Sequence, residues 1–171
     1  MKCLKLIILA FAFLTAQLYA EIQDYHLAAG DVVSIHVYGQ ADLSVKAKID
    51  NKGVINYPFI GEVLLINKTT SEVRENISEA LKDGYLISPE VHVSVIEYRP
   101  FYIHGQVKRP GSFAYQPGLV LAKAIALAGG LTERASNTWL LERNSGEIKI
   151  EANSQTEILP GDVITIKQSF F

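Results

Sequence analysis

Apolar and polar residues alternate in several short stretches of the chain, and this period of two is typical of half-buried strands. The clearest stretch covers residues 31–38, where Val33, Ile35 and Val37 fall on one face. Further strands are predicted, in chain order, at residues 44–50, 53–57, 61–63, 91–95, 101–105, 138–143, 147–151 and 162–167. The pattern therefore predicts a chain made mostly of strands.

Turn-forming residues predict how neighbouring strands connect. The run Asp50-Asn-Lys-Gly53 tolerates left-handed backbone and predicts a hairpin between the strands on either side of it. Pro110-Gly111 fits the two central positions of a type II turn between a strand and its return strand. Another hairpin is predicted around Asn144-Ser-Gly146.

The clearest helical signal covers about residues 70–83. Thr69 and Glu72 have the spacing of a capping box at its start, and Gly84 can end it. Its apolar residues recur every four positions and form a narrow stripe: Val73, Ile77 and Leu81. A helix with such a stripe is expected to lie on a sheet.

A second helix is predicted from Leu119 to Ala128, rich in alanine and ended by Gly129-Gly130. Strands precede and follow both helices. The predicted fold class is therefore α+β, with two small β-rich modules, each with one helix packed on a sheet. The order of elements in the later module is that of a β-grasp unit.

One short pattern occurs twice, 131 residues apart. Leu27-Ala-Ala-Gly30-Asp31 returns as Ile158-Leu-Pro-Gly161-Asp162, and β-branched residues follow each copy. Glycine supplies the positive φ of a tight turn, and the Asp side chain is expected to accept hydrogen bonds from backbone N–H groups just beyond it. The two copies indicate two modules, which we place at residues 21–99 and 100–171.

The first twenty residues have the features of a secretory signal. Lys2 and Lys5 give a positive segment before the unbroken apolar run Leu6–Leu14, which is shorter than the roughly 20 residues of a membrane span. Cleavage is expected between Ala16 and Ala20, and we take Ala20, so residues 1–20 are assigned as signal peptide. Cys3, the one cysteine, lies within it, so the exported chain is predicted to have neither a disulfide nor a lipid-bearing cysteine.

The net charge argues against nucleic acid as a partner. The 171 residues carry a formal charge of −2, which becomes about −4 when the two lysines of the signal are removed. A mildly acidic chain is poorly matched to nucleic acid or to anionic lipid. Its size is enough for one ordinary domain or two small ones.

Neither the histidines nor the acidic residues have the spacing of a metal or catalytic site. The residues considered are His26, His36, His92, His104, Glu72, Glu75, Glu79, Asp31 and Asp162. The second and third histidines are expected on polar strand faces, and the two aspartates are expected to cap turns. Gly129-Gly130 end a helix rather than begin one, so they do not form a phosphate loop. We therefore predict no enzyme, catalytic residue, metal or cofactor.

Aromatic residues gather near the module boundary, in the run Tyr98-Arg99-Pro100-Phe101-Tyr102, and Trp139 is expected near them. Such rings could stack on sugars, and the arginine could hold an acidic polymer. The interpretation we favour is that these side chains pack the two modules together or line a subunit contact.

A series of turn motifs carries a family resemblance. The first part consists of Leu27-x-x-Gly30-Asp31-Val, Gly53-x-Ile55-x-x-Pro58-x-Ile60-Gly61-x-Val63 and Pro89-x-Val91-x-Val93. The second consists of Val107-x-x-Pro110-Gly111, Ala128-Gly129-Gly130-Leu131-Thr132, Ala135, Arg143, Gly146 and Pro160-Gly161-Asp162-Val163-Ile164. In this order they resemble the polysaccharide export domain and the soluble-ligand-binding β-grasp (SLBB) domain of the bacterial outer-membrane polysaccharide export family, whose members translocate capsule and exopolysaccharide.

The resemblance implies a non-enzymatic protein that is periplasmic or associated with the outer membrane. It implies a homo-oligomeric ring or collar, through which polysaccharide passes from an inner-membrane polysaccharide co-polymerase. The alternative is a periplasmic module whose β-grasp unit captures a small ligand or a glycan.

Three features depart from larger members of that family. The chain has no acylated N-terminal cysteine, it has one β-grasp unit, and it stops at Phe170-Phe171 without an amphipathic C-terminal helix. We therefore expect a short, unlipidated, periplasmic member that relies on a separate outer-membrane β-barrel for the last step.

Extraction from membranes tests this expectation. Expressed without partners, the exported chain should be released by alkaline carbonate, and its intact mass should correspond to an N-terminus at Glu21. Retention in the carbonate-washed membrane in the absence of any partner would show that the expectation is wrong.

Overall fold

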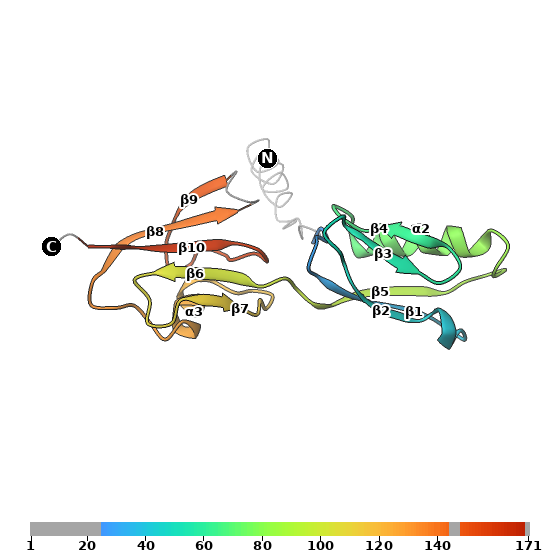
Figure 1. Cartoon of the computed structure of the whole chain (residues 1–171), viewed down its shortest axis with the longest axis horizontal. Helices are drawn as coiled ribbons and strands as arrows, with labels where there is room; N and C mark the ends of the chain where they lie inside the picture. The colour runs from blue at the N-terminus through green and yellow to red at the C-terminus, as the bar shows by residue number, and fades with distance from the viewer. Residues whose placement is uncertain (1–24, 144–147, 170–171) are drawn as a thin grey trace, which may run out of the picture.

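The computed structural model describes residues 25–143 and 148–169, which form two lobes side by side along the longest axis of the molecule (Figure 1). The signal peptide predicted at residues 1–20, the turn at Asn144-Ser-Gly146 and the terminal Phe170-Phe171 lie outside the described residues. The elements are β1 (Val32–Val37), a 3₁₀ turn (Ala41–Leu43), β2 (Val45–Lys48), β3 (Val54–Tyr57), β4 (Gly61–Leu64), α2 (Thr70–Lys82), β5 (Val91–Glu97), β6 (Phe101–Gly105), β7 (Gly111–Phe113), α3 (Leu121–Leu127), β8 (Ala135–Arg143), β9 (Ile148–Ala152) and β10 (Val163–Gln168).

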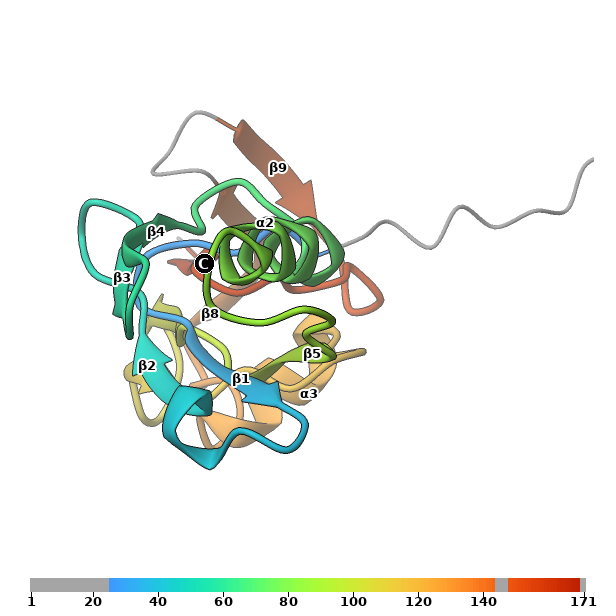
Figure 2. The same ribbon diagram turned by 90° about the vertical axis from the view of Figure 1, so that its right-hand side faces the viewer.

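The first lobe is built on an antiparallel sheet with strand order β2-β1-β5. Alternation decides its faces, because Val33, Ile35 and Val37 of β1 are buried while His36 between them is exposed. Viewed along the long axis, α2 and the β3–β4 pair lie over the same side of this sheet (Figure 2). The predicted strands at 31–38 and 91–95 are confirmed.

Helix α2 forms where its caps and its apolar stripe predict it. The Thr69 side chain accepts a hydrogen bond from the backbone N–H of Glu72, and the Glu72 carboxylate accepts one from the backbone N–H of Thr69. This is a complete capping box. The stripe Val73, Ile77 and Leu81 is fully buried, and Gly84 follows with a φ of +92°.

The hairpin predicted around residues 50–53 is wrong in its pairing, although the turn itself exists. The Asp50 carboxylate accepts hydrogen bonds from the backbone N–H groups of Lys52 and Val54. However, β2 pairs with β1, and β3 pairs with β4 in a separate two-stranded sheet. The turn therefore carries the chain from one sheet to the other, because alternation defines a strand's faces but not its partner.

The second lobe contains a five-stranded mixed sheet in the order β7-β6-β10-β8-β9. The last strand, β10, lies in its centre, parallel to β6 and antiparallel to β8. Helix α3 contributes Leu121, Ala124 and Ile125 to the buried cluster. A helix packed on such a sheet is β-grasp-like, as predicted.

The type II turn predicted at Pro110-Gly111 is not present. Gly111 already belongs to β7 and pairs with Ile103, so residues 106–110 make the reversal as a longer loop. The predicted pairing of the strands on either side of residues 144–146 is confirmed, because β8 and β9 are antiparallel neighbours. Gly129 and Gly130 end α3 with φ of +80° and +91°, as expected for a helix C-terminus.

Two separate hydrophobic clusters support the two lobes. One contains buried residues between Leu27 and Val93, and the other contains buried residues between Phe101 and Ile166. The α+β fold class is confirmed, while the boundary placed at residues 99 and 100 stays a prediction.

The capping box gives a test of how much α2 depends on its first turn. Replacing Thr69 by alanine removes the acceptor for the Glu72 N–H and should lower the free energy of unfolding by about 1 kcal/mol. Thr69→Ser keeps the hydroxyl and should cost much less. Urea denaturation of the two variants measures the difference, and equal loss in both would contradict the role of the cap.

Candidate functional site

The two copies of the repeated pattern meet where the lobes join. In each copy the leading apolar residue, Leu27 or Ile158, is fully buried, and the glycine has positive φ, +97° at Gly30 and +85° at Gly161. In the part of the chain that the structure describes, the two aspartates, Asp31 and Asp162, are the buried charged residues. We call this region, with linker residues 98–100, the junction.

Each aspartate caps its own turn, but in the direction opposite to the one predicted. Asp31 Oδ2 accepts from the N–H of Ala28 at 2.9 Å, and Asp162 Oδ2 accepts from the N–H of Leu159 at 2.8 Å. Both donors lie three residues before the aspartate rather than beyond it. The physical reason is that the turn folds the preceding backbone back over the carboxylate.

Arg99, in the linker, completes the environment of Asp31. Its backbone N–H donates to Asp31 Oδ1 at 2.8 Å, and its Nη1 lies 3.4 Å from Asp31 Oδ2. The Tyr25 hydroxyl donates to Asp31 Oδ2 at 2.6 Å and accepts from Arg99 Nη1 at 2.9 Å. Burial, and then this hydrogen bond to Asp31, raise the pKa of Tyr25, so the phenol stays protonated.

Asp162 has an arginine partner from its own lobe. Arg143, on β8, donates from Nε to Oδ1 at 2.9 Å and from Nη2 to Oδ2 at 2.8 Å. This two-point geometry is the strong form of an arginine–carboxylate pair. The hydrogen bond to Asp162 is the largest of the effects that raise the pKa of Arg143.

Arg99 also lies against both turn glycines. A Cβ added to Gly161 would lie 2.7 Å from Arg99 Nε, and one added to Gly30 would lie 3.4 Å from Arg99 Cβ. Backbone hydrogen bonds join the same region, since the N–H of Gly161 donates to the carbonyl of Pro100, and that of Tyr102 to the carbonyl of Asp162. The linker is therefore packed between the two turns.

Tyr98 connects aromatic residues of the two lobes. Its ring meets that of Tyr25 edge to face at 5.0 Å, and that of Tyr115, from the second lobe, at 5.3 Å. Burial raises the pKa of Tyr115, and the carboxylate of Glu157 adds to this shift. The predicted packing role of the aromatic run is supported at Tyr98.

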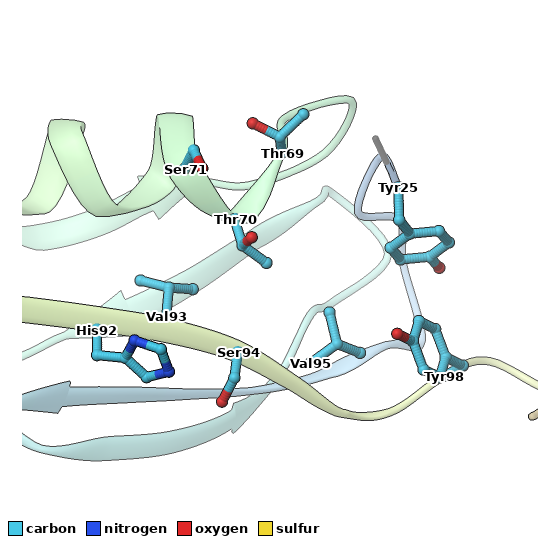
Figure 3. Close-up of a pocket in the computed structure, with 9 residues that line it drawn as sticks. All are labelled: Tyr25, Thr69, Thr70, Ser71, His92, Val93, Ser94, Val95 and Tyr98. Atoms are coloured by element: carbon cyan, nitrogen blue, oxygen red, sulfur yellow. The ribbon is translucent and has the colours of Figure 1, made fainter. Parts of the chain in front are cut away.

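Two hollows lie on either side of the Tyr25–Tyr98 pair. The junction cleft, of about 620 Å³, lies between the lobes, and its lining includes Arg99, Tyr115 and Arg143. The α2–β5 groove, of about 290 Å³, runs between the first turn of α2 and strand β5. Figure 3 shows the two tyrosines at one end of this groove and Thr70 pointing from α2 towards β5.

The remaining aromatic candidates do not join this site. Phe101 is fully buried in the second cluster, and Tyr102 is half exposed on β6. Trp139 was expected near the junction, but it lies opposite Ile166 on β10. Ile166 is four residues further along the chain than Asp162, so Trp139 is away from the junction. Its indole N–H donates to the carbonyl of Ser136, so the expectation for Trp139 is corrected.

The histidines and glutamates lie where solvent reaches them. His36 and His92 face each other across β1 and β5 on the exposed side of the sheet, as predicted. Glu72 serves the capping box, while Glu75 and Glu79 are exposed on α2. Among residues 25–143 and 148–169, no three His, Cys, Asp or Glu side chains are close enough to hold a metal ion.

The role of the two arginines was missed by sequence reasoning. Arg99 lies 68 residues from Asp31, and Arg143 lies 19 residues from Asp162, so no local spacing connects either pair. The available signal was the repeated Gly-Asp itself. A buried aspartate needs a cationic or donor-rich partner, and arginine is the residue most suited to that role.

Comparison with known proteins identifies the domains that this chain contains. A model of the polysaccharide biosynthesis/export protein family matches residues 20–96, and one of the SLBB domain matches residues 100–149. The chain therefore carries a polysaccharide export domain followed by an SLBB domain.

Individual relatives agree with this assignment. The chain is 35% identical over 113 residues to the exopolysaccharide production protein ExoF of Rhizobium meliloti, covering 63% of this chain and 27% of that protein. It is 24% identical over 141 residues to the polysialic acid transport protein KpsD of Escherichia coli, with 81% and 25% covered. It is 26% identical over 141 residues to the EPS I polysaccharide export outer membrane protein EpsA of Ralstonia solanacearum, with 67% and 37% covered.

The chain thus spans only about a quarter to two fifths of the length of these curated relatives. Within the described residues, none of the helices is both long enough and apolar enough to cross a membrane.

The buried aspartate of the second lobe gives a test of the junction. Asp162→Asn removes the charge that Arg143 binds at two points, and it should lower the free energy of unfolding by about 3 kcal/mol. The matched control is Asp50→Asn, because Asp50 is an exposed turn aspartate whose loss should cost about 1 kcal/mol. Thermal and urea unfolding of both variants measure the effect, and an equal cost would show that burial adds nothing.

Proposed function

We propose that this chain is a non-enzymatic component of a polysaccharide export machine in the periplasm. The observation that carries the proposal is the order of its two matched domains, export domain first and SLBB domain second. The names of the relatives, which describe exopolysaccharide production, polysialic acid transport and polysaccharide export, support the same role.

The proposed mechanism is geometric rather than chemical. The two buried carboxylates, which are the strongest candidates for chemistry, use their oxygens to bind backbone N–H groups and arginines. Copies of the chain, made of modules 21–99 and 100–171, pack side by side into a ring or collar, and the polysaccharide passes along it. A ring of identical copies requires two different contact surfaces on each copy.

The proposed partners follow from this arrangement. They are the polysaccharide, further copies of this chain, an inner-membrane polysaccharide co-polymerase and a separate outer-membrane β-barrel. The second candidate function is a periplasmic binding module for a small ligand or glycan, and the junction cleft is the observation that favours it.

Deletion of the gene tests the proposed role. Cells that lack the chain should lose surface polysaccharide, and the full-length gene should restore it. A gene that lacks residues 1–20 is the control, because its product should stay in the cytoplasm and fail to restore export. Unchanged surface polysaccharide in the deletion strain would contradict the role in export.

The oligomeric state separates the two candidate functions. Size-exclusion chromatography with light scattering should show that the particle contains more than one copy of the chain, either alone or with the co-polymerase. A strict monomer under both conditions and at every concentration would favour the binding module instead.

A further inference from the structure

We propose that the junction cleft and the α2–β5 groove form one binding track for an uncharged, polyhydroxylated glycan segment, centred on Tyr25 and Tyr98. This proposal rests on the proposed function, because it assigns the place where the polysaccharide contacts the chain. The two hollows share both tyrosines as lining residues, so a single extended ligand can cross from one to the other. Their volumes, about 620 and 290 Å³, are in the range of ligand sites.

The arginines of the junction keep donors that the protein does not use. Within the described chain, Arg99 donates from its side chain only through Nη1, and Arg143 only through Nε and Nη2. Their side chains are 27% and 23% exposed, and both line the cleft. The buried aspartates hold these guanidinium groups in fixed positions, so the remaining N–H groups are preorganised to donate to a ligand.

The charges around the cleft favour a neutral ligand. Asp31 and Asp162 balance the two arginines, and the exposed Glu157 adds a further negative charge to the lining. An acidic polymer would therefore meet no net positive charge. Sugar hydroxyl groups, by contrast, can accept from the guanidinium N–H groups and donate to the carboxylate of Glu157.

Unpartnered hydroxyl groups continue along the track. The hydroxyl of Tyr98 makes no hydrogen bond with the described residues, and the same holds for Thr70 and Ser71, which line the groove from α2. Beside them, β5 is an edge strand of its sheet, so half of its backbone groups face away from β1. The tyrosine rings supply apolar surface between these polar groups, a mixture suited to the C–H and O–H groups of a sugar.

A different occupant, an added polypeptide strand, could also use the β5 edge. It would explain the groove but not the cleft, because Tyr115 and Arg143 of the cleft lining lie in the second lobe, away from that edge. The glycan accounts for both hollows and is the occupant we propose.

Titration of the isotope-labelled, exported chain with defined tetrasaccharides tests the proposal by NMR. The probes are maltotetraose and cellotetraose as neutral glycans, with tetragalacturonate as the acidic comparison. We expect the neutral probes to shift resonances of residues 25–28, 69–71, 94–99 and 115 at about millimolar affinity. The acidic probe should bind more weakly.

Tyr98→Phe is the test variant, because it removes the free hydroxyl while keeping the ring and its edge-to-face contacts. It should weaken binding about three- to tenfold. Tyr38→Phe is the matched control, because Tyr38 is an exposed tyrosine at the end of β1, outside both hollows, and it should leave binding unchanged. Unshifted spectra elsewhere verify the fold of both variants.

Three results would overturn the proposal. They are no shifts with any probe at about 10 mM, shifts outside the two hollows, or shifts along β5 that depend only on protein concentration and so indicate strand pairing between copies. If the wild-type chain restores export in the deletion strain but gives one of these results, the binding track is wrong while the proposed function stands.

Discussion

The buried carboxylate of Asp31 is the constraint on which the connection between the lobes depends. A charge removed from water costs several kcal/mol unless hydrogen bonds and an opposite charge replace the lost solvation. Here the replacement comes from the linker, since both the backbone and the guanidinium of Arg99 bind the carboxylate. Because Arg99 also fills the space against Gly30 and Gly161, solvating Asp31 fixes the path of the chain between the lobes. The need to compensate one buried charge of the first lobe therefore fixes how the chain connects to the second lobe.

Asp162 solves the same problem with a partner from within its own lobe. Its carboxylate is satisfied by Arg143 on the neighbouring strand β8, so the second turn does not need the linker's side chain. The linker instead contacts this turn through backbone hydrogen bonds. The side chain of Arg99 fits against Gly161 because that residue has no Cβ. The two copies of the pattern are thus alike in local geometry but differ in role. The first holds Arg99 by charge, and the second accommodates it by shape.

Local features of the fold could be predicted from the sequence, because they depend on neighbouring residues. The capping box of α2, its stripe of Val73, Ile77 and Leu81, and the buried face of β1 all follow from spacing alone. The pairing of β2 with β1, and the partners of the two aspartates, depend on residues brought together only by folding. Alternation and turn chemistry contain no information about such distant partners, and this is why the hairpin at 50–53 and the position of Trp139 were predicted wrongly.

Tyr98 can both pack the junction and contact a moving polymer, because its ring makes the packing contacts and its hydroxyl group is left for a ligand. Edge-to-face contacts with Tyr25 and Tyr115 hold the ring of Tyr98 in place, while its hydroxyl has no hydrogen-bond partner among the described residues. A side chain fixed in this way loses little entropy when a ligand arrives, and each hydrogen bond to it contributes only about 1 kcal/mol after exchange with water. Several such contacts in sequence give weak binding that is easily reversed. For a component of an export machine, reversible contact is compatible with transport, whereas a site that bound the polymer tightly would stop it.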